Sequence, residues 1–124
     1  MYTLDTNPII YYTDDEPAAV TVLEDLFSQA VPVYVSTITE LELFSYPAMT
    51  DEEEARIEAF LTAVRIVPVT SPIARLAGDL RRVHPGLRAF DSAIAATALF
   101  TNSTLVTRNV RDFQGINGLL LLPI

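Results

Sequence analysis

Four acidic side chains, far apart in the sequence, occupy positions where catalytic or ligand-binding residues are expected. Asp5 directly follows the apolar stretch Tyr2–Leu4, and Glu42 lies on the helix predicted after a second apolar stretch. Asp91 begins a helix of small residues, and Asp112 follows a fourth apolar stretch. Because the carboxyl ends of parallel strands share one edge of a sheet, where ligands bind, these four carboxylates are expected to converge there.

Converging carboxylates predict a site for a divalent cation. Their charges repel one another, and a cation among them removes that cost. Oxygen ligands suit Mg²⁺ or Mn²⁺, which keep several waters and bind phosphate oxygens. Such a site activates water for in-line attack on phosphorus and stabilises the leaving oxygen, so phosphodiester hydrolysis is the reaction that fits best. The chain has one histidine and no cysteine, which argues against a zinc hydrolase.

Each acidic position also has a structural interpretation that the sequence leaves open. Asp5 and Asp91 are each suited to capping the helix that follows. Glu40 competes with Glu42, because residues two apart lie on different helix faces. Asp112 can pair with a neighbouring arginine on the surface. The polar residues beside the acids can also be turn residues that bond their own backbone, and they are Thr6, Asn7, Thr107 and Asn109.

Short apolar runs that alternate with helical patterns predict the elements that position these residues. Strands are expected at 2–4, 33–35, 66–69, 104–107 and 119–122. Helices are expected from Pro8 to residue 12 and at 18–30, 38–44, 51–64, 71–83 and 90–100. The alternation predicts an α/β three-layer domain with a mainly parallel central sheet. Pro68 predicts an edge position for the third strand, because proline cannot donate a hydrogen bond to a neighbour.

Composition limits the classes of protein to which the chain can belong. At 124 residues, half of them hydrophobic, it fits one globular domain spanning residues 1–124. It has no apolar run long enough to cross a membrane and no start typical of a secretion signal, so a soluble cytoplasmic protein is expected. The net charge of −8 argues against general electrostatic binding of nucleic acid.

The charge is distributed unevenly along the chain. Thirteen acids and one arginine precede residue 63, whereas three acids and seven arginines follow it, and lysine is absent. The carboxyl half can therefore still present guanidinium groups to phosphate, which arginine binds with two parallel hydrogen bonds.

Four segments that span nearly the whole chain carry the candidate acids: Leu4–Asn7, Val35–Leu43, Phe90–Leu99 and Leu105–Phe113. Their order and spacing resemble the PIN-domain family, and within it the VapC-like ribonuclease toxins of prokaryotic toxin–antitoxin pairs. The resemblance implies a PIN-like fold and an endoribonuclease that depends on Mg²⁺ or Mn²⁺. It also implies an RNA substrate, a homodimer, and inhibition by a small cognate antitoxin that covers the active cleft.

The resemblance assigns catalytic and metal-binding roles by position. Asp5 is the first acid, Glu42 the second and Asp91 the third. The last acid falls after the fourth predicted strand, where Asp112 is the preferred carboxylate and Asn109 becomes a polar helper. The supporting polar residues are Thr6, Asn7 and Thr107. In place of the glycine that often follows the second acidic helix in relatives, this chain has the segment Phe44–Pro47.

Three other functions fit the sequence less well. Haloacid-type phosphatases require Asp-x-Asp after the first strand, but here Asp5 is followed by Thr6 and Asn7. Response-regulator receivers require a lysine, and this chain has none. A degenerate PIN domain that binds RNA or protein without cutting is the non-enzymatic alternative, and the retained acids argue against it.

Overall fold

A five-stranded sheet forms the centre of the structure, a computed structural model that describes residues 1–124. Its strand order is β3-β2-β1-β4-β5. Every neighbouring pair is parallel, which agrees with the predicted mainly parallel sheet. The strands are β1 (Tyr2–Leu4), β2 (Val33–Ser36), β3 (Arg65–Val67), β4 (Thr104–Thr107) and β5 (Leu121–Pro123). The helices are α1 (Thr6–Thr13), α2 (Pro17–Ser28), α3 (Thr37–Leu43), α4 (Asp51–Leu61), α5 (Ser71–Val83), α6 (Ala89–Phe100) and α7 (Val110–Phe113).

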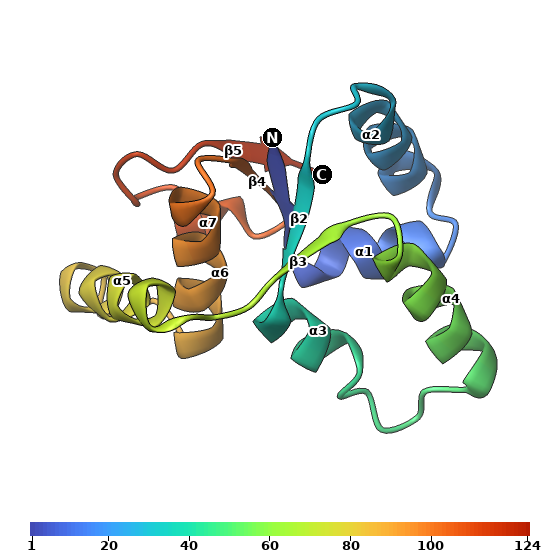
Figure 1. Ribbon diagram of the computed structural model, residues 1–124, viewed down its shortest axis with the longest axis horizontal. Coiled ribbons are helices and arrows are strands. Elements are labelled where there is room, and N and C mark those ends of the chain that lie inside the picture. Colours follow the sequence, from blue (N-terminus) through green and yellow to red (C-terminus); the bar gives the residue numbers. More distant parts are fainter.

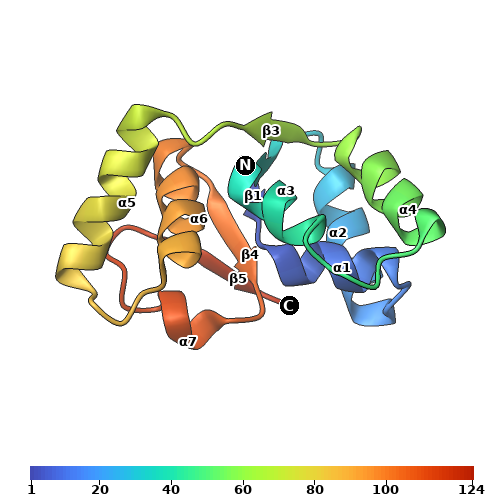
Figure 2. The same ribbon diagram turned by 90° about the horizontal axis from the view of Figure 1, so that it is seen from below.

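Helices cover both faces of the sheet, which gives the α/β layering expected from the sequence (Figures 1 and 2). Consecutive residues of a strand point to opposite faces. Val106 therefore packs in one apolar cluster with residues of α1, α2 and α4, while the adjacent Leu105 packs in another with residues of α6. α5 lies outside α6 and contacts it through Ile73 and Ala77. The core is thus divided into two parts by the sheet.

Small side chains allow α6 to lie close against the sheet. Ala93, Ala95, Ala96 and Ala98 are all buried, and two of them share an apolar cluster with Leu105 of β4. Since protein interiors are close-packed, a larger side chain at these positions has no space to occupy.

Replacing Ala95 with Leu is expected to lower the free energy of unfolding by about 1–3 kcal/mol, because overpacking forces the core to rearrange. Ala95 is fully buried. The matched control is Ala55→Leu on the exposed surface of α4, which is expected to change stability by less than about 0.5 kcal/mol. Urea denaturation would measure both. Equal effects at the two positions would contradict close packing of α6.

The strand order creates one switch point, between β1 and β4. The chain passes from β1 outwards to β2 and β3, then crosses through α5 and α6 to β4 on the other side of β1. In open α/β sheets, such a point leaves a crevice outside the carboxyl ends of the two strands. Asp5 follows β1 and Thr107 ends β4, so both residues lie at this crevice.

The prediction that the first helix begins at Pro8 is wrong, because α1 begins at Thr6, directly after Asp5. Asp5 is the N-cap residue, and its Oδ1 accepts a hydrogen bond from the backbone N–H of Thr6 at 2.8 Å. Pro8 then occupies the third helical position. A backbone N–H at that position would have no partner within the helix, so proline is tolerated there.

Two strand boundaries also differ from the prediction. β3 lies at the edge of the sheet, as expected, but it ends at Val67, so that Pro68 follows the strand instead of belonging to it. β5 begins at Leu121, two residues later than expected. The preceding residues still form a turn, in which the N–H of Leu119 donates to the carbonyl of Ile116 at 3.3 Å.

The other expected helices agree with the structure to within three residues at each end, and α7 is a short additional helix that the sequence did not predict. None of the helices has the length and hydropathy that crossing a membrane requires.

Candidate active site

The carboxylate of Asp5 is buried and held at both of its oxygens. Asp5 is 4% exposed. Its Oδ1 accepts the N–H of Thr6 as described above, and its Oδ2 accepts a hydrogen bond from Oγ1 of Thr107 at 2.7 Å. One partner comes from the start of α1 and the other from the end of β4, so the two strands at the switch point together fix the orientation of this carboxylate.

Burial raises the pKa of the Asp5 carboxyl above its ordinary value, because a charged group is poorly solvated there. The hydrogen bonds from Thr107 and Thr6 favour the ionised form and lower the pKa, but they do not outweigh the burial. The negative charges of Asp91 and Glu42 raise the pKa further, which requires that both lie near Asp5. The structure therefore brings three of the four predicted acids together.

Glu42 lies on α3 and reaches the site through a hydrogen bond. Oγ1 of Thr6 donates to Oε1 of Glu42 at 2.6 Å, which joins the start of α1 to the end of α3. The position of α3 is fixed by its N-cap, since Oγ of Ser36 accepts the N–H of Ile38 at 3.1 Å. Glu40 on the same helix makes no hydrogen bond to these residues, so Glu42 is the acid that α3 supplies to the site.

Asp91 is 7% exposed and stands in the first turn of α6. The interpretation of Asp91 as the N-cap is wrong, because Arg88 is the N-cap residue and Asp91 is the third residue of the helix. Nε of Arg88 lies 3.4 Å from Oδ2 of Asp91. This arginine is a functional candidate that sequence reasoning missed, although its spacing of three residues from Asp91 was a usable indication.

Asp112 differs from these three acids in its exposure and in having no effect on the pKa of Asp5. It lies on α7. Neither of its expected arginine partners pairs with it, because Arg108 pairs with Glu16 at 3.7 Å and Arg111 forms no ion pair. Asp112 instead lines a surface hollow together with Asp91.

The predicted supporting residues divide into three kinds. Thr6 and Thr107 bond directly to the acids. Asn109 acts through its backbone, since its N–H donates to Oγ1 of Thr107 at 3.0 Å. This hydrogen bond helps to orient the hydroxyl that donates to Asp5. Asn7, the second residue of α1, is half-buried and its side chain makes no hydrogen bond to the acids.

The donor set of the site suits a hard divalent cation. No group of three or more acidic or histidine side chains is arranged to hold a metal ion by itself. Mg²⁺ does not require such a cage, because it usually keeps several waters and binds through one or two carboxylates together with substrate phosphates. The carboxylates of Asp5, Asp91 and Glu42 supply both the oxygen donors and the negative charge that such a cation prefers.

The fold and the site together define an α/β protein whose acidic side chains gather outside the carboxyl ends of a parallel sheet, at its switch point. Within this class the chain belongs to the PIN domain family, whose model matches residues 2–119.

Similar proteins of known name cover nearly the whole chain. Ribonuclease VapC19 of Mycobacterium tuberculosis is 35% identical over 117 residues, which cover 91% of this chain and 92% of that protein. The tRNA(fMet)-specific endonuclease VapC of Shigella flexneri is 29% identical over 126 residues, covering 95% of this chain and 93% of the relative.

Solved structures of toxin–antitoxin complexes share the fold. VapBC2 from Rickettsia felis, bound to a DNA fragment from the promoter, matches with a TM-score of 0.85 and 27% identity over 99% of this chain and 98% of that chain. A toxin–antitoxin complex from Klebsiella pneumoniae matches with a TM-score of 0.82 and 29% identity over the whole of both chains.

Proposed function

We propose that this protein is an endoribonuclease of the VapC type, that it depends on Mg²⁺ or Mn²⁺, and that it is the toxin of a toxin–antitoxin pair. The observation that carries the proposal is the gathering of Asp5, Glu42 and Asp91 at the switch point of the sheet. Membership of the PIN domain family and similarity to proteins named as ribonucleases support it. The same similarity favours this function over a degenerate domain that binds without cutting.

In the proposed mechanism, Asp5, Glu42 and Asp91 would hold the cation next to the phosphodiester bond, together with waters and the substrate phosphate. When bound, the cation would polarise the phosphoryl oxygen and lower the pKa of water. Thr107 and the backbone of Thr6 keep the carboxylate of Asp5 in one orientation, so it does not have to be ordered when substrate arrives. The hydroxyl of Thr6 does the same for Glu42.

Asp112 stays a predicted fourth acid, with a different position from the other three. It approaches the site from the hollow that Asp91 also lines. Its exposure means that water screens its charge, so we expect it to contribute less to cleavage than the buried acids do.

The proposed partners follow from the relatives. An antitoxin is the expected inhibitor, because the similar solved structures are toxin–antitoxin complexes. RNA is the proposed substrate, since relatives are named as ribonucleases, and we place the protein in the cytoplasm, where RNA is available. We also propose a homodimer, on the basis of the family resemblance.

Cleavage of a mixed RNA pool by the purified protein, free of antitoxin, tests the proposal. Wild type is expected to cut in Mg²⁺ or Mn²⁺ and not in chelator. Asp91→Asn is expected to lower the rate by at least about a hundredfold and Asp112→Asn by about tenfold, because each contributes differently to holding the cation. Asp25→Asn, an exposed acid on α2, is the control and should cut like wild type.

Cutting that persists in Asp91→Asn would assign the activity to a contaminant. If the wild-type protein cut no RNA with either cation, the binding-only alternative would be favoured. Equal loss in Asp91→Asn and Asp112→Asn would show that Asp112 belongs to the central group of acids.

A further inference from the structure

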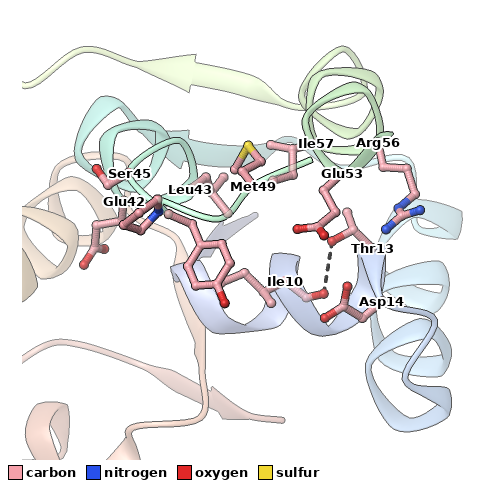
Figure 3. A pocket seen from close by; sticks show the side chains of 12 residues that line it. Ile10, Thr13, Asp14, Glu42, Leu43, Ser45, Met49, Glu53, Arg56 and Ile57 are labelled. Carbon is pink, nitrogen blue, oxygen red and sulfur yellow. Dashed lines mark hydrogen bonds between the residues drawn. The ribbon is translucent and has the colours of Figure 1, made fainter. Parts of the chain in front are cut away.

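Two surface hollows lie beside the acidic site, and they differ in charge. The first, of about 590 Å³, is formed by α1, the segment after α3, and α4 (Figure 3). Glu42 lines it together with Asp14 and Glu53, and Arg56 is its one cationic side chain. We call this the acid-lined hollow. Because three carboxylates face one guanidinium, it repels a strand of phosphates.

The second hollow, of about 630 Å³, shares Asp91 with the acidic site. We call it the arginine hollow, and its lining consists of residues 83–88, Asp91, Arg111, Asp112 and residues 114–116. Two guanidinium groups belong to it, Arg88 before α6 and Arg111 on α7, and they balance the carboxylates of Asp91 and Asp112, whereas in the acid-lined hollow the carboxylates are in excess. Arg88 and Arg111 are two of the eight arginines in a chain that carries a net charge of −8.

Arg111 is the guanidinium of this hollow that is available to a ligand. Arg88 is engaged with Asp91 at 3.4 Å, whereas Arg111 is exposed and forms no ion pair. Its sequence neighbour Asp112 lines the same hollow but forms no ion pair with it. An unpaired arginine binds phosphate through two parallel hydrogen bonds.

The wall of the arginine hollow is preformed. Nε of Arg81 on α5 donates to the carbonyl of Leu87 at 3.0 Å, and the side chain of Leu87 is buried in the core. The N–H of Leu87 donates to the carbonyl of His84 at 2.9 Å, which closes the turn. The imidazole of His84 lies beside Gly115, which also lines the hollow. A ligand therefore meets a surface whose backbone is already ordered.

We propose that the arginine hollow holds the RNA strand next to the bond that is cut, with Arg111 as the contact to a phosphate adjacent to the one at the acids. The proposal rests on the ribonuclease function proposed above. A strand bound at the acids continues along one of the two hollows, and their charges select the one that contains Arg111. Arg88 lies between Asp91 and this path, where it limits repulsion of the incoming phosphate.

Binding of labelled single-stranded RNA tests the proposal. Fluorescence anisotropy in Mg²⁺, with Asp5→Asn as the background to prevent cutting, would be recorded at several salt concentrations. Arg111→Ala is expected to weaken binding by about fivefold at roughly 0.1 M salt and to reduce the salt slope by about 0.7, the effect of one lost phosphate contact on a single strand. In the cleaving protein, Arg111→Ala should raise KM and leave kcat nearly unchanged.

Two control variants separate this site from a general effect of charge. Arg75→Ala removes an exposed, unpaired arginine from α5 and is expected to bind RNA like the background protein. Arg56→Ala removes the arginine of the acid-lined hollow and is also expected to have no effect.

The outcomes distinguish this proposal from the proposed function. If Arg111→Ala matched Arg75→Ala in affinity and salt slope while wild type still cut RNA, the path of the strand would lie elsewhere and only this proposal would be overturned. Weaker binding in Arg56→Ala but not in Arg111→Ala would place the strand in the acid-lined hollow. A background protein that bound no RNA, together with a wild type that cut none, would overturn both.

Discussion

Replacing Asp5 with Asn is expected to lower RNA cleavage by about a thousandfold while leaving the protein folded. Asp5 is the most buried of the three gathered acids, and its two oxygens are already oriented by Thr107 and Thr6. Removing its charge weakens the hold on the cation. Since a bound metal supplies several kcal/mol of transition-state stabilisation, and about 1.4 kcal/mol is a factor of ten, a thousandfold loss is the expected scale.

The same substitution is expected to stabilise the protein in the presence of chelator. Asn keeps the shape of the side chain, and its carbonyl can still accept the N–H of Thr6. The amide carries no charge, so it avoids both the burial of a carboxylate and the repulsion from Asp91 and Glu42 that raise the pKa of Asp5. Thermal unfolding in chelator near pH 7 should therefore give a higher Tm for Asp5→Asn than for wild type.

The dependence of stability on pH gives a second measurement of the same effect. Because the pKa of Asp5 is raised in the folded state, the folded protein binds this proton more tightly than the unfolded chain. The stability that Asp5 contributes is present below its unfolded pKa and is lost as pH rises through its folded pKa. Wild type in chelator should show this loss above about pH 4, and Asp5→Asn should not.

The matched control is Asp25→Asn, which removes one exposed carboxylate from α2 and should change neither cleavage nor this pH dependence. A variant Asp5→Asn that was less stable than wild type in chelator would show that the carboxylate serves mainly as the cap of α1. Such a protein could lose cleavage through misfolding alone, and the catalytic assignment of Asp5 would fail.

Local chemistry explains why much of the framework could be predicted from the sequence. Apolar runs such as Leu105-Val106 are expected to be buried, and they are buried in the structure. Their alternation with helical patterns predicts a parallel sheet. The caps of α3 and α4 were also predictable, since Ser36 and Thr50 accept hydrogen bonds from N–H groups just along the chain. These interactions join residues that are close in sequence.

The contacts that complete the site join residues that are far apart in sequence, and no local sequence pattern predicts them. The hydrogen bond between Thr6 and Glu42 spans 36 positions, and the one between Thr107 and Asp5 spans 102. The first depends on β2 and the helix after it lying beside β1, and the second on β4 lying on the other side of β1, so both follow from the strand order and not from any single segment. The sequence could therefore identify the candidate acids, but it could not predict the hydrogen bonds that fix their orientation.

At two positions, Asp5 and Asp112, the sequence allows both a structural role and a chemical role. The sequence allows Asp5 either to cap a helix or to serve the site, and in the structure one of its oxygens caps α1 while the charges of Asp91 and Glu42 raise its pKa. Asp112 was grouped with the same acids because it follows β4. It lies on α7, a short helix that had no predictive pattern, and lines the arginine hollow together with Asp91, so its role as a fourth acid stays a prediction.

Adding Mg²⁺ or Mn²⁺ to chelator-treated protein is expected to restore RNA cleavage and to raise the Tm of wild type by several degrees. A ligand that binds only the folded state stabilises it by about 2.7 kcal/mol at a hundred times its dissociation constant. For a chain of this length, that corresponds to a rise in Tm of roughly 5–12 °C. Differential scanning calorimetry with increasing cation would measure the shift, and a parallel cleavage assay would give its functional counterpart.

The variants decide whether such a shift comes from the proposed site. The carboxylates of Asp5, Glu42 and Asp91 repel one another without a cation, so neutralising Asp5 both raises the starting Tm and removes a ligand. The rise in Tm on adding cation should therefore shrink to near zero in Asp5→Asn and persist in Asp25→Asn. An equal rise in both variants would locate the bound cation away from the switch point, and cleavage that continued in chelator would contradict metal dependence directly.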